Sequence, residues 1–197
     1  MTSETPLKNS ITIFVIIHDD VPLTKRETLY EDYFHHLKVE LESFIERKIH
    51  IVIGNSGPPY SNFEYKGDNL KPILDRWEML GLRYLREAKE QGFDTNPLSK
   101  VVLVTHEQLN SKTGGIALLN SYTGAGSFAI ASLFSYLAPA HEVGHLLGAR
   151  HEDFEVQYNG WWGETYMTPQ RTPIRSISYH FSPANRQNIK HYLASRA

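Results

Sequence analysis

The segment "PAHEVGHLLGARHED", residues 139–153, places three histidines at spacings of four and six residues. On a helix, His141 and His145 lie one turn apart, so both imidazoles project from the same face and can reach one metal ion. Glu142 lies beside that face, where it is suited to contact a water on the metal as a general base. The segment therefore predicts a helix that carries two metal ligands and a base.

A catalytic zinc needs a third protein ligand and an open position. His151 can be that ligand only if the helix stops before it, because a continuing helix would carry it far along the axis from His141. Gly148 lies between the second and third histidines and can end the helix, since glycine adopts a positive φ without steric cost. We therefore expect one catalytic Zn²⁺ ion held by His141, His145 and His151, with Glu142 as the catalytic base.

Upstream of this segment, apolar runs of strand length alternate with longer stretches of helical periodicity. Strands are expected at residues 11–18, 49–55, 100–105, 114–121 and 126–134. A helix with Thr24 as its N-cap is expected within 24–48, and a second over 70–91 with Gly92 as its stop. This order favours an α/β (α+β) fold with a twisted, mostly parallel sheet.

The remaining chain is expected to complete one catalytic domain over residues 1–197. A helix over 135–149 carries the histidines, and an irregular stretch follows until Ser182, an N-cap, and Pro183 open a terminal helix. We expect an N-terminal lobe over 1–148, which includes the active-site helix, and a C-terminal lobe over 149–197.

The composition excludes several classes of function. The chain has 197 residues, of which 41% are apolar and 21% charged, as in ordinary globular proteins. The net charge of −2 and the lack of a basic run give no reason to expect a nucleic-acid partner or an acidic membrane partner. Cysteine is absent, so disulfides and thiolate zinc sites cannot form, and histidines and carboxylates are the available metal ligands.

The early apolar run "ITIFVII", residues 11–17, is too short to span a bilayer. The acidic "HDD" follows at once, and no small-residue cleavage site comes next, so we expect a buried strand and not an ordinary signal peptide. Localisation stays open between the cytoplasm and export by a specialised route, and the oligomeric state stays open as well.

The segment "HEVGHLLGARH", residues 141–151, resembles H-E-x-x-H-x-x-G-x-x-H, the zinc signature of the metzincin metallopeptidases. The resemblance implies a zinc-dependent endopeptidase that acts on protein or peptide substrates. It also implies an antiparallel edge strand, an active-site helix, an irregular lower lobe ending in a helix, and a methionine turn beneath the zinc. Within "ETYMTP", Met167 matches that methionine.

The same resemblance gives "GSFAIAS", residues 126–132, as the edge strand that pairs with an extended substrate, although a solely structural strand fits these residues equally well. No substrate-binding residue is assigned. Residues 168–178 would form part of the wall that receives the substrate side chain after the cut. Arg171 and Arg175 lie there; an acidic preference is one interpretation, and ordinary surface positions are the favoured one.

The sequence also departs from the family pattern. In astacin-like and serralysin-like metzincins a tyrosine two residues after the methionine approaches the metal, and this chain has Pro169 there. Tyr158, Tyr166 and Tyr179 are all candidates for an assisting tyrosine. Without cysteine, neither the latency device of matrixins nor the second zinc site of archaemetzincins can form. No subfamily is assigned.

Two alternatives to an endopeptidase remain. The same residues would serve a zinc aminopeptidase, or a zinc-binding recognition module with little or no turnover. Glu142 argues against the recognition module, because a purely structural zinc needs no positioned base and usually has a closed fourth ligand.

Overall fold

The main sheet has five strands in the order β2-β1-β3-β5-β4. The computed structural model describes residues 9–54, 57–158, 160–170, 172 and 174–196. The strands are β1 (Ile11–Ile17), β2 (Ile49–Gly54), β3 (Lys100–Thr105), β4 (Gly115–Leu119) and β5 (Gly126–Ser132). All neighbouring strands are parallel except β4, which runs antiparallel to β5. The expected mostly parallel sheet with an antiparallel edge strand is confirmed.

The position of residues 126–132 corrects one expectation. These residues form β5, which pairs with β3 on one side and with β4 on the other. Both of its hydrogen-bonding sides are therefore used inside the sheet, and β5 cannot be the edge strand. On this side of the sheet the edge strand is β4, and β2 is the edge strand on the other side.

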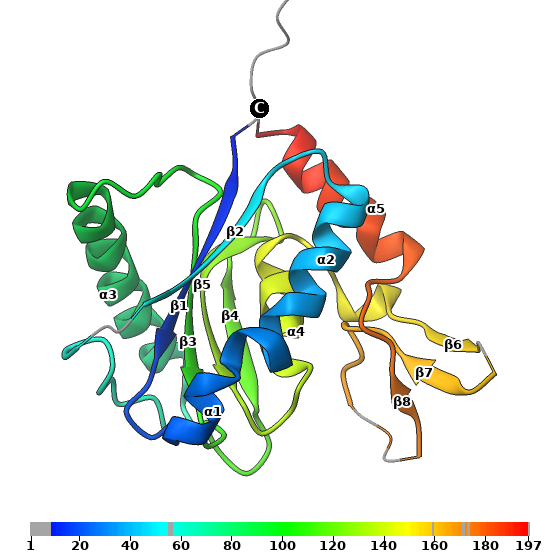
Figure 1. Cartoon of the computed structure of the whole chain (residues 1–197), viewed down its shortest axis with the longest axis horizontal. Coiled ribbons are helices and arrows are strands. Elements are labelled where there is room, and N and C mark those ends of the chain that lie inside the picture. The colour runs from blue at the N-terminus through cyan, green and yellow to red at the C-terminus, as the bar shows by residue number, and fades with distance from the viewer. Residues whose placement is uncertain (1–8, 55–56, 159, 171, 173, 197) are drawn as a thin grey trace, which may run out of the picture.

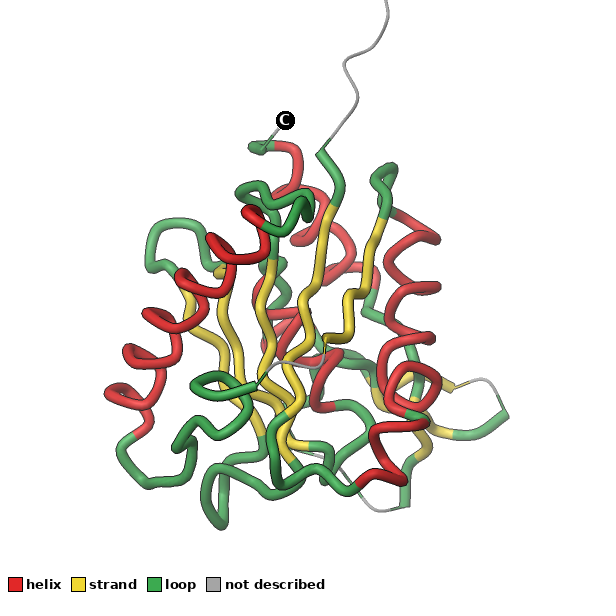
Figure 2. Tube along the Cα trace, turned by 60° about the vertical axis from the view of Figure 1, so that its left-hand side comes forward, coloured by secondary structure: helices red, strands yellow, loops and turns green. Residues whose placement is uncertain are grey.

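Helices cover both faces of the sheet (Figures 1 and 2). They are α1 (Leu23–Glu27), α2 (His35–Phe44), α3 (Leu70–Glu90), α4 (Ala138–Leu146) and α5 (Pro183–Ala194). Successive side chains of a strand point to opposite faces. Accordingly, Ile13 and Val15 belong to the core that α2 and α4 cover, whereas Phe14 and Ile16 pack with Trp77 of α3. The central strands are buried on both faces, which explains why they are continuous apolar runs.

The helix ends partly follow the predicted signals. Ser182 caps α5, since its side chain accepts a hydrogen bond from the backbone N–H of Asn185 at 3.2 Å. Gly92 follows the end of α3 with a φ of 88°. The expected N-cap at Thr24 is wrong, because α1 begins at Leu23 and Thr24 lies inside the helix. Pro22 occupies the N-cap position without a side-chain hydrogen bond, and its fixed φ leads into the first turn.

The expected helix within 24–48 is divided into three parts. A π-helical turn, η1 (Tyr30–Phe34), separates α1 from α2. Beyond α4, a second small sheet has the order β6-β7-β8. It comprises β6 (Val156–Tyr158), β7 (Trp162–Glu164) and β8 (Ser176–Ile177), and it lies beside α4 and below α5 (Figure 1).

Helix α5 is attached to α2 by a buried carboxylate. Glu40 accepts hydrogen bonds from Arg186 Nε at 3.0 Å and Nη2 at 2.9 Å, and from the backbone N–H of Phe181 at 2.8 Å. These contacts hold α5 against α2. No helix in the described ranges is long and apolar enough to cross a membrane.

Candidate metal centre and active site

Helix α4 brings two of the three predicted ligands together and then ends. It spans Ala138–Leu146, shorter at both ends than the predicted 135–149. Gly148 follows with a φ of 91°, and the N–H of Ala149 donates to the carbonyl of Gly144 at 2.9 Å, which closes the helix end. The chain then turns back into a short 3₁₀ turn, η2 (His151–Asp153), that begins with the third histidine. Gly148 thus lies where the predicted turn requires it.

The segment before His151 is held from outside the helix. Asn185 of α5 is fully buried. Its side chain accepts a hydrogen bond from the N–H of Arg150 at 2.7 Å and donates one to the Arg150 carbonyl at 3.0 Å. The residue preceding the third histidine is therefore fixed on both sides of its backbone by the C-terminal helix.

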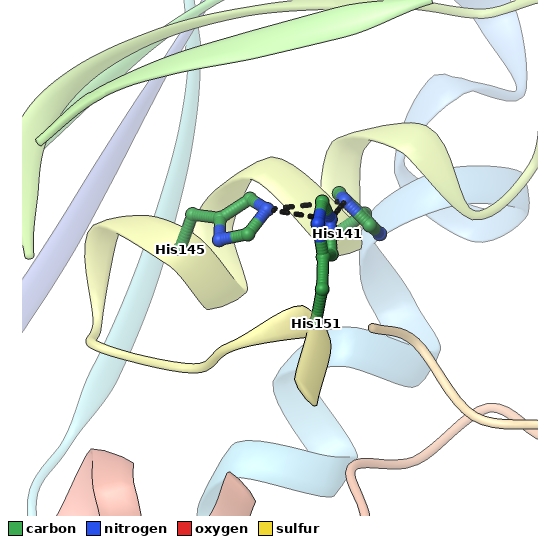
Figure 3. Close-up of side chains that lie close together, drawn as sticks. All are labelled: His141, His145 and His151. Carbon is green, nitrogen blue, oxygen red and sulfur yellow. Dashed lines mark hydrogen bonds between the residues drawn. The ribbon is translucent and has the colours of Figure 1, made fainter. Parts of the chain in front are cut away.

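The three imidazoles converge on one point (Figure 3). The Nε2 atoms of His141 and His145 are 3.2 Å apart, those of His145 and His151 3.1 Å, and those of His141 and His151 2.8 Å. Tetrahedral bonds of about 2.05 Å to one zinc ion would separate such nitrogens by roughly 3.3 Å. Across the described residues, this trio is the one group of histidines and acidic side chains placed to hold a metal ion.

The hydrogen bonds of the rings show which nitrogen is free to bind a cation. His141 Nδ1 lies 2.8 Å from the carbonyl oxygen of Tyr166, and His145 Nδ1 lies 3.1 Å from that of Ala149. A carbonyl oxygen only accepts, so each Nδ1 carries the proton and donates it. The Nε2 atoms of these two rings are left with lone pairs that point at each other, an arrangement that a bound cation stabilises.

Electrostatics keep the two helical ligands neutral. Burial, together with the neighbouring His145, lowers the pKa of His141 to about 3. Burial and the neighbouring His151 lower the pKa of His145 to about 4. Neutral imidazole is the form that binds a metal ion. A set of three imidazoles without thiolates suits Zn²⁺, so the residues present fit the expected zinc ion.

Glu142 lies between the two helical histidines in sequence and is 5% exposed. Burial raises the pKa of its carboxyl group to about 8. It lines a cleft of about 250 Å³ together with His141 and His151. The predicted base and the predicted ligands are therefore neighbours on one wall of this cleft.

Met167 lies beneath the helix that carries the ligands. It is fully buried, and a Cβ added to Gly144 would lie 2.6 Å from its sulfur. The methionine side chain therefore packs directly on the helix backbone between the two helical histidines. Tyr166, the preceding residue, supplies the carbonyl that orients His141.

The three candidate assisting tyrosines differ in whether they line the cleft. Tyr166 lines it, and its buried hydroxyl has no hydrogen-bond partner among the described residues. Tyr179 stacks on His36 with ring centroids 4.4 Å apart. Tyr158 is 66% exposed on β6 and does not line the cleft. An assisting role for a tyrosine stays a prediction.

The segment after the methionine takes part in the cleft through Thr168 and Pro169. Arg175 forms an ion pair with the buried Glu164 at 3.4 Å, which supports a structural position for this arginine. Arg171 lies outside the described residues.

Sequence reasoning did not identify Gly115, Gly144 or the carbonyls that fix the imidazole tautomers. Gly144 carried a weak signal, because a glycine in the middle of a helix weakens it and needs a packing reason. Gly115 carried no such signal, because the Glu142 side chain lies against Gly115 only once α4 has packed on the sheet.

Comparisons with known proteins place the fold. No protein-family model matches the sequence, and no curated protein matches it. Among solved structures, the chain is similar to metalloproteinase-II from Bacteroides fragilis, with a TM-score of 0.66 and 17% identity. That match covers 96% of this chain and 55% of the other, so this chain spans about half the length of that relative.

Two archaeal structures match over nearly their whole length. Archaemetzincin from Methanopyrus kandleri has a TM-score of 0.52 at 15% identity, and the match covers 94% of this chain and 96% of that one. A zinc-dependent peptidase from Methanocorpusculum labreanum has a TM-score of 0.50 at 17% identity, covering 90% and 99%. At these identities the likeness is one of fold, and it is shared with zinc metallopeptidases. The lack of cysteine still excludes a thiolate second zinc site here.

Proposed function

We propose that this protein is a zinc-dependent endopeptidase of the metzincin type. His141, His145 and His151 hold the ion, and Glu142 is the catalytic base. The observation that carries the proposal is the convergence of three imidazole Nε2 atoms within 3.2 Å of one another, beside a buried carboxylate in an open cleft. The fold shared with zinc metallopeptidases supports it.

The residues of the cleft divide the chemistry between them. Zinc, when bound, supplies a Lewis acid that polarises the scissile carbonyl and increases the acidity of a water molecule. Glu142 takes the proton from the attacking water onto its carboxylate and then delivers it to the nitrogen of the leaving amine. Backbone carbonyls hold His141 and His145 in the tautomer that this arrangement needs.

The shape of the cleft favours cleavage within a chain over removal of its first residue. Gly114 and Gly115, at the start of edge strand β4, line the cleft, so an extended peptide can add to this edge by backbone hydrogen bonds. An aminopeptidase needs an acidic group to hold the free α-amine. Of the described residues that line the cleft, Glu142 alone carries a carboxylate, and the base role uses it.

The test compares the wild type with Glu142→Gln on one peptide library in two forms, with free ends and blocked at both ends, after each protein has been loaded with zinc. Glu90→Gln, which changes an exposed glutamate at the end of α3, is the matched control. We expect internal cleavage by the wild type and the control, loss of cleavage on chelation, and a decrease of about 10²–10⁴-fold for Glu142→Gln.

Three results would redirect the proposal. Equal cleavage by Glu142→Gln removes the assigned base. Cleavage confined to peptides with a free amino terminus supports the aminopeptidase. Stoichiometric zinc with no cleavage by any of the proteins supports a recognition module.

A further inference from the structure

Gly115 is the first residue of edge strand β4, opposite Ala131 of β5, and the Glu142 side chain lies directly against it in the lining of the cleft. A Cβ added to Gly115 would lie 2.4 Å from Oε1 of Glu142, and 2.9 Å from both its Cδ and its Cγ. The φ of Gly115 is not positive, so its backbone conformation is open to other residues. The need for glycine here comes from the space that the Glu142 side chain occupies.

Nothing else in the described part of the chain directs this carboxylate. No hydrogen bond or ion pair reaches Glu142 from the described residues, although Glu142 is only 5% exposed. A buried carboxylate usually takes its orientation from donors around it. Here packing has that role, and the carboxylate of Glu142 occupies the space that a side chain at Gly115 would fill.

We propose that Gly115 is a positioning residue for the catalytic base: its missing side chain creates the space in which the Glu142 carboxylate lies at the correct height over the metal centre. This inference rests on the proposed role of Glu142. It adds that the edge strand controls the chemical step as well as lining the path of the substrate.

The expected displacement follows from the contact distances. Ordinary contacts of a Cβ atom begin at 3.4 Å, so a methyl group at Gly115 would push Oε1 away by about 1 Å. A general base works within hydrogen-bond reach of the proton that it takes. A misplacement of about 1 Å can cost roughly 10²-fold in rate. The proposed zinc ligands are the three imidazoles, and the proposed substrate contacts are backbone groups of β4, so we expect zinc binding and substrate binding to be independent of this carboxylate position.

The test uses Gly115→Ala with Gly57→Ala as its control, because a Cβ at Gly57 meets nothing within 4 Å and Gly57 does not line the cleft. We expect Gly115→Ala to lower kcat about 100-fold, while KM and zinc affinity stay within about threefold of the wild type. The control should keep kcat within about threefold.

A second readout needs no activity. Glu142→Ala removes the Cγ, Cδ and Oε1 atoms that the added Cβ would meet, so Gly115→Ala should lower the melting temperature of the chelated protein less in that background than in the wild type. The same change should give no further loss of kcat there. This cycle separates a conflict with Glu142 from a general disturbance of β4.

The inference is overturned if Gly115→Ala keeps kcat near the wild-type value while Glu142→Gln is inactive. It is also overturned if Gly115→Ala lowers the melting temperature equally in both backgrounds. A failure of the proposed function is distinct, since wild type and Glu142→Gln would then behave alike, and the melting cycle would still decide the steric relation.

Discussion

Replacing Glu40 by methionine is expected to lower the free energy of unfolding by about 3 kcal/mol. Removing one partner of a buried ion pair costs about 3–5 kcal/mol, because the other charge remains without compensation. Arg186 is 37% exposed and can still reach water, which places the expected loss at the lower end. The N–H of Phe181 also loses its acceptor, at a cost of about 1–3 kcal/mol that is part of the same total.

The assay is denaturant unfolding of the chelated protein, so that zinc binding does not mask the loss. For a chain of this size, 3 kcal/mol corresponds to a decrease in Tm of about 6–12 °C. Glu42→Gln is the control, since Glu42 pairs with Lys38 on the exposed surface of the same helix and should contribute less than about 1 kcal/mol. Glu40→Met combined with Arg186→Met should be more stable than Glu40→Met alone, because no unpaired charge remains. A loss below about 1 kcal/mol for Glu40→Met, or a double variant no more stable than the single one, would refute this reasoning.

Further predictions concern the metal centre. Gly148→Ala places a side chain at a φ of 91° and should cost about 1–2 kcal/mol; we also expect weaker zinc binding by titration, because His151 follows this turn, and unchanged zinc affinity would contradict it. Gly144→Ala forces Met167 to move, since the new Cβ would lie 2.6 Å from its sulfur; an unfolding experiment on the chelated protein should show a loss of about 1–3 kcal/mol. The pKa of Glu142 is raised by burial from 4.5 to about 8, so the stability that this group contributes is present below pH 4.5 and is lost as pH rises toward 8. The unfolding free energy of chelated wild type, measured relative to Glu142→Gln, should therefore fall across that window, and a flat difference would contradict the assigned shift.

The parts of the fold that depend on local pattern could be predicted from the sequence. The central strands are apolar along their whole length because both faces are buried, and Ser182 and Gly92 carry the chemistry of helix ends. The strands β6, β7 and β8 are only two or three residues long, too short for a periodic signal. The π-helical turn η1 also gives no recognisable signal in the sequence. The division of the chain into two lobes at residue 148 stays a prediction.

The candidate site follows the same distinction. His141, His145 and His151 were recognisable because helix geometry and one glycine relate them along a short segment. The order of β4 and β5 in the sheet could not be recognised from the sequence, because strand pairing joins segments that no local pattern relates. The edge position was therefore predicted for the wrong strand. The contact of Gly115 with Glu142 arises only once a helix has been laid across the sheet.

The clamp of Asn185 on Arg150 ties the residue before His151, the proposed third zinc ligand, to α5, an element synthesised after the histidines themselves. A chain emerging from the ribosome would carry all three imidazoles well before the helix that steadies the last of them. Tight zinc binding, and with it the proposed peptidase activity, would thus be delayed until α5 has packed against the rest of the domain. For the proposed endopeptidase, this order of assembly would spare the newly made chain and its neighbours premature cleavage.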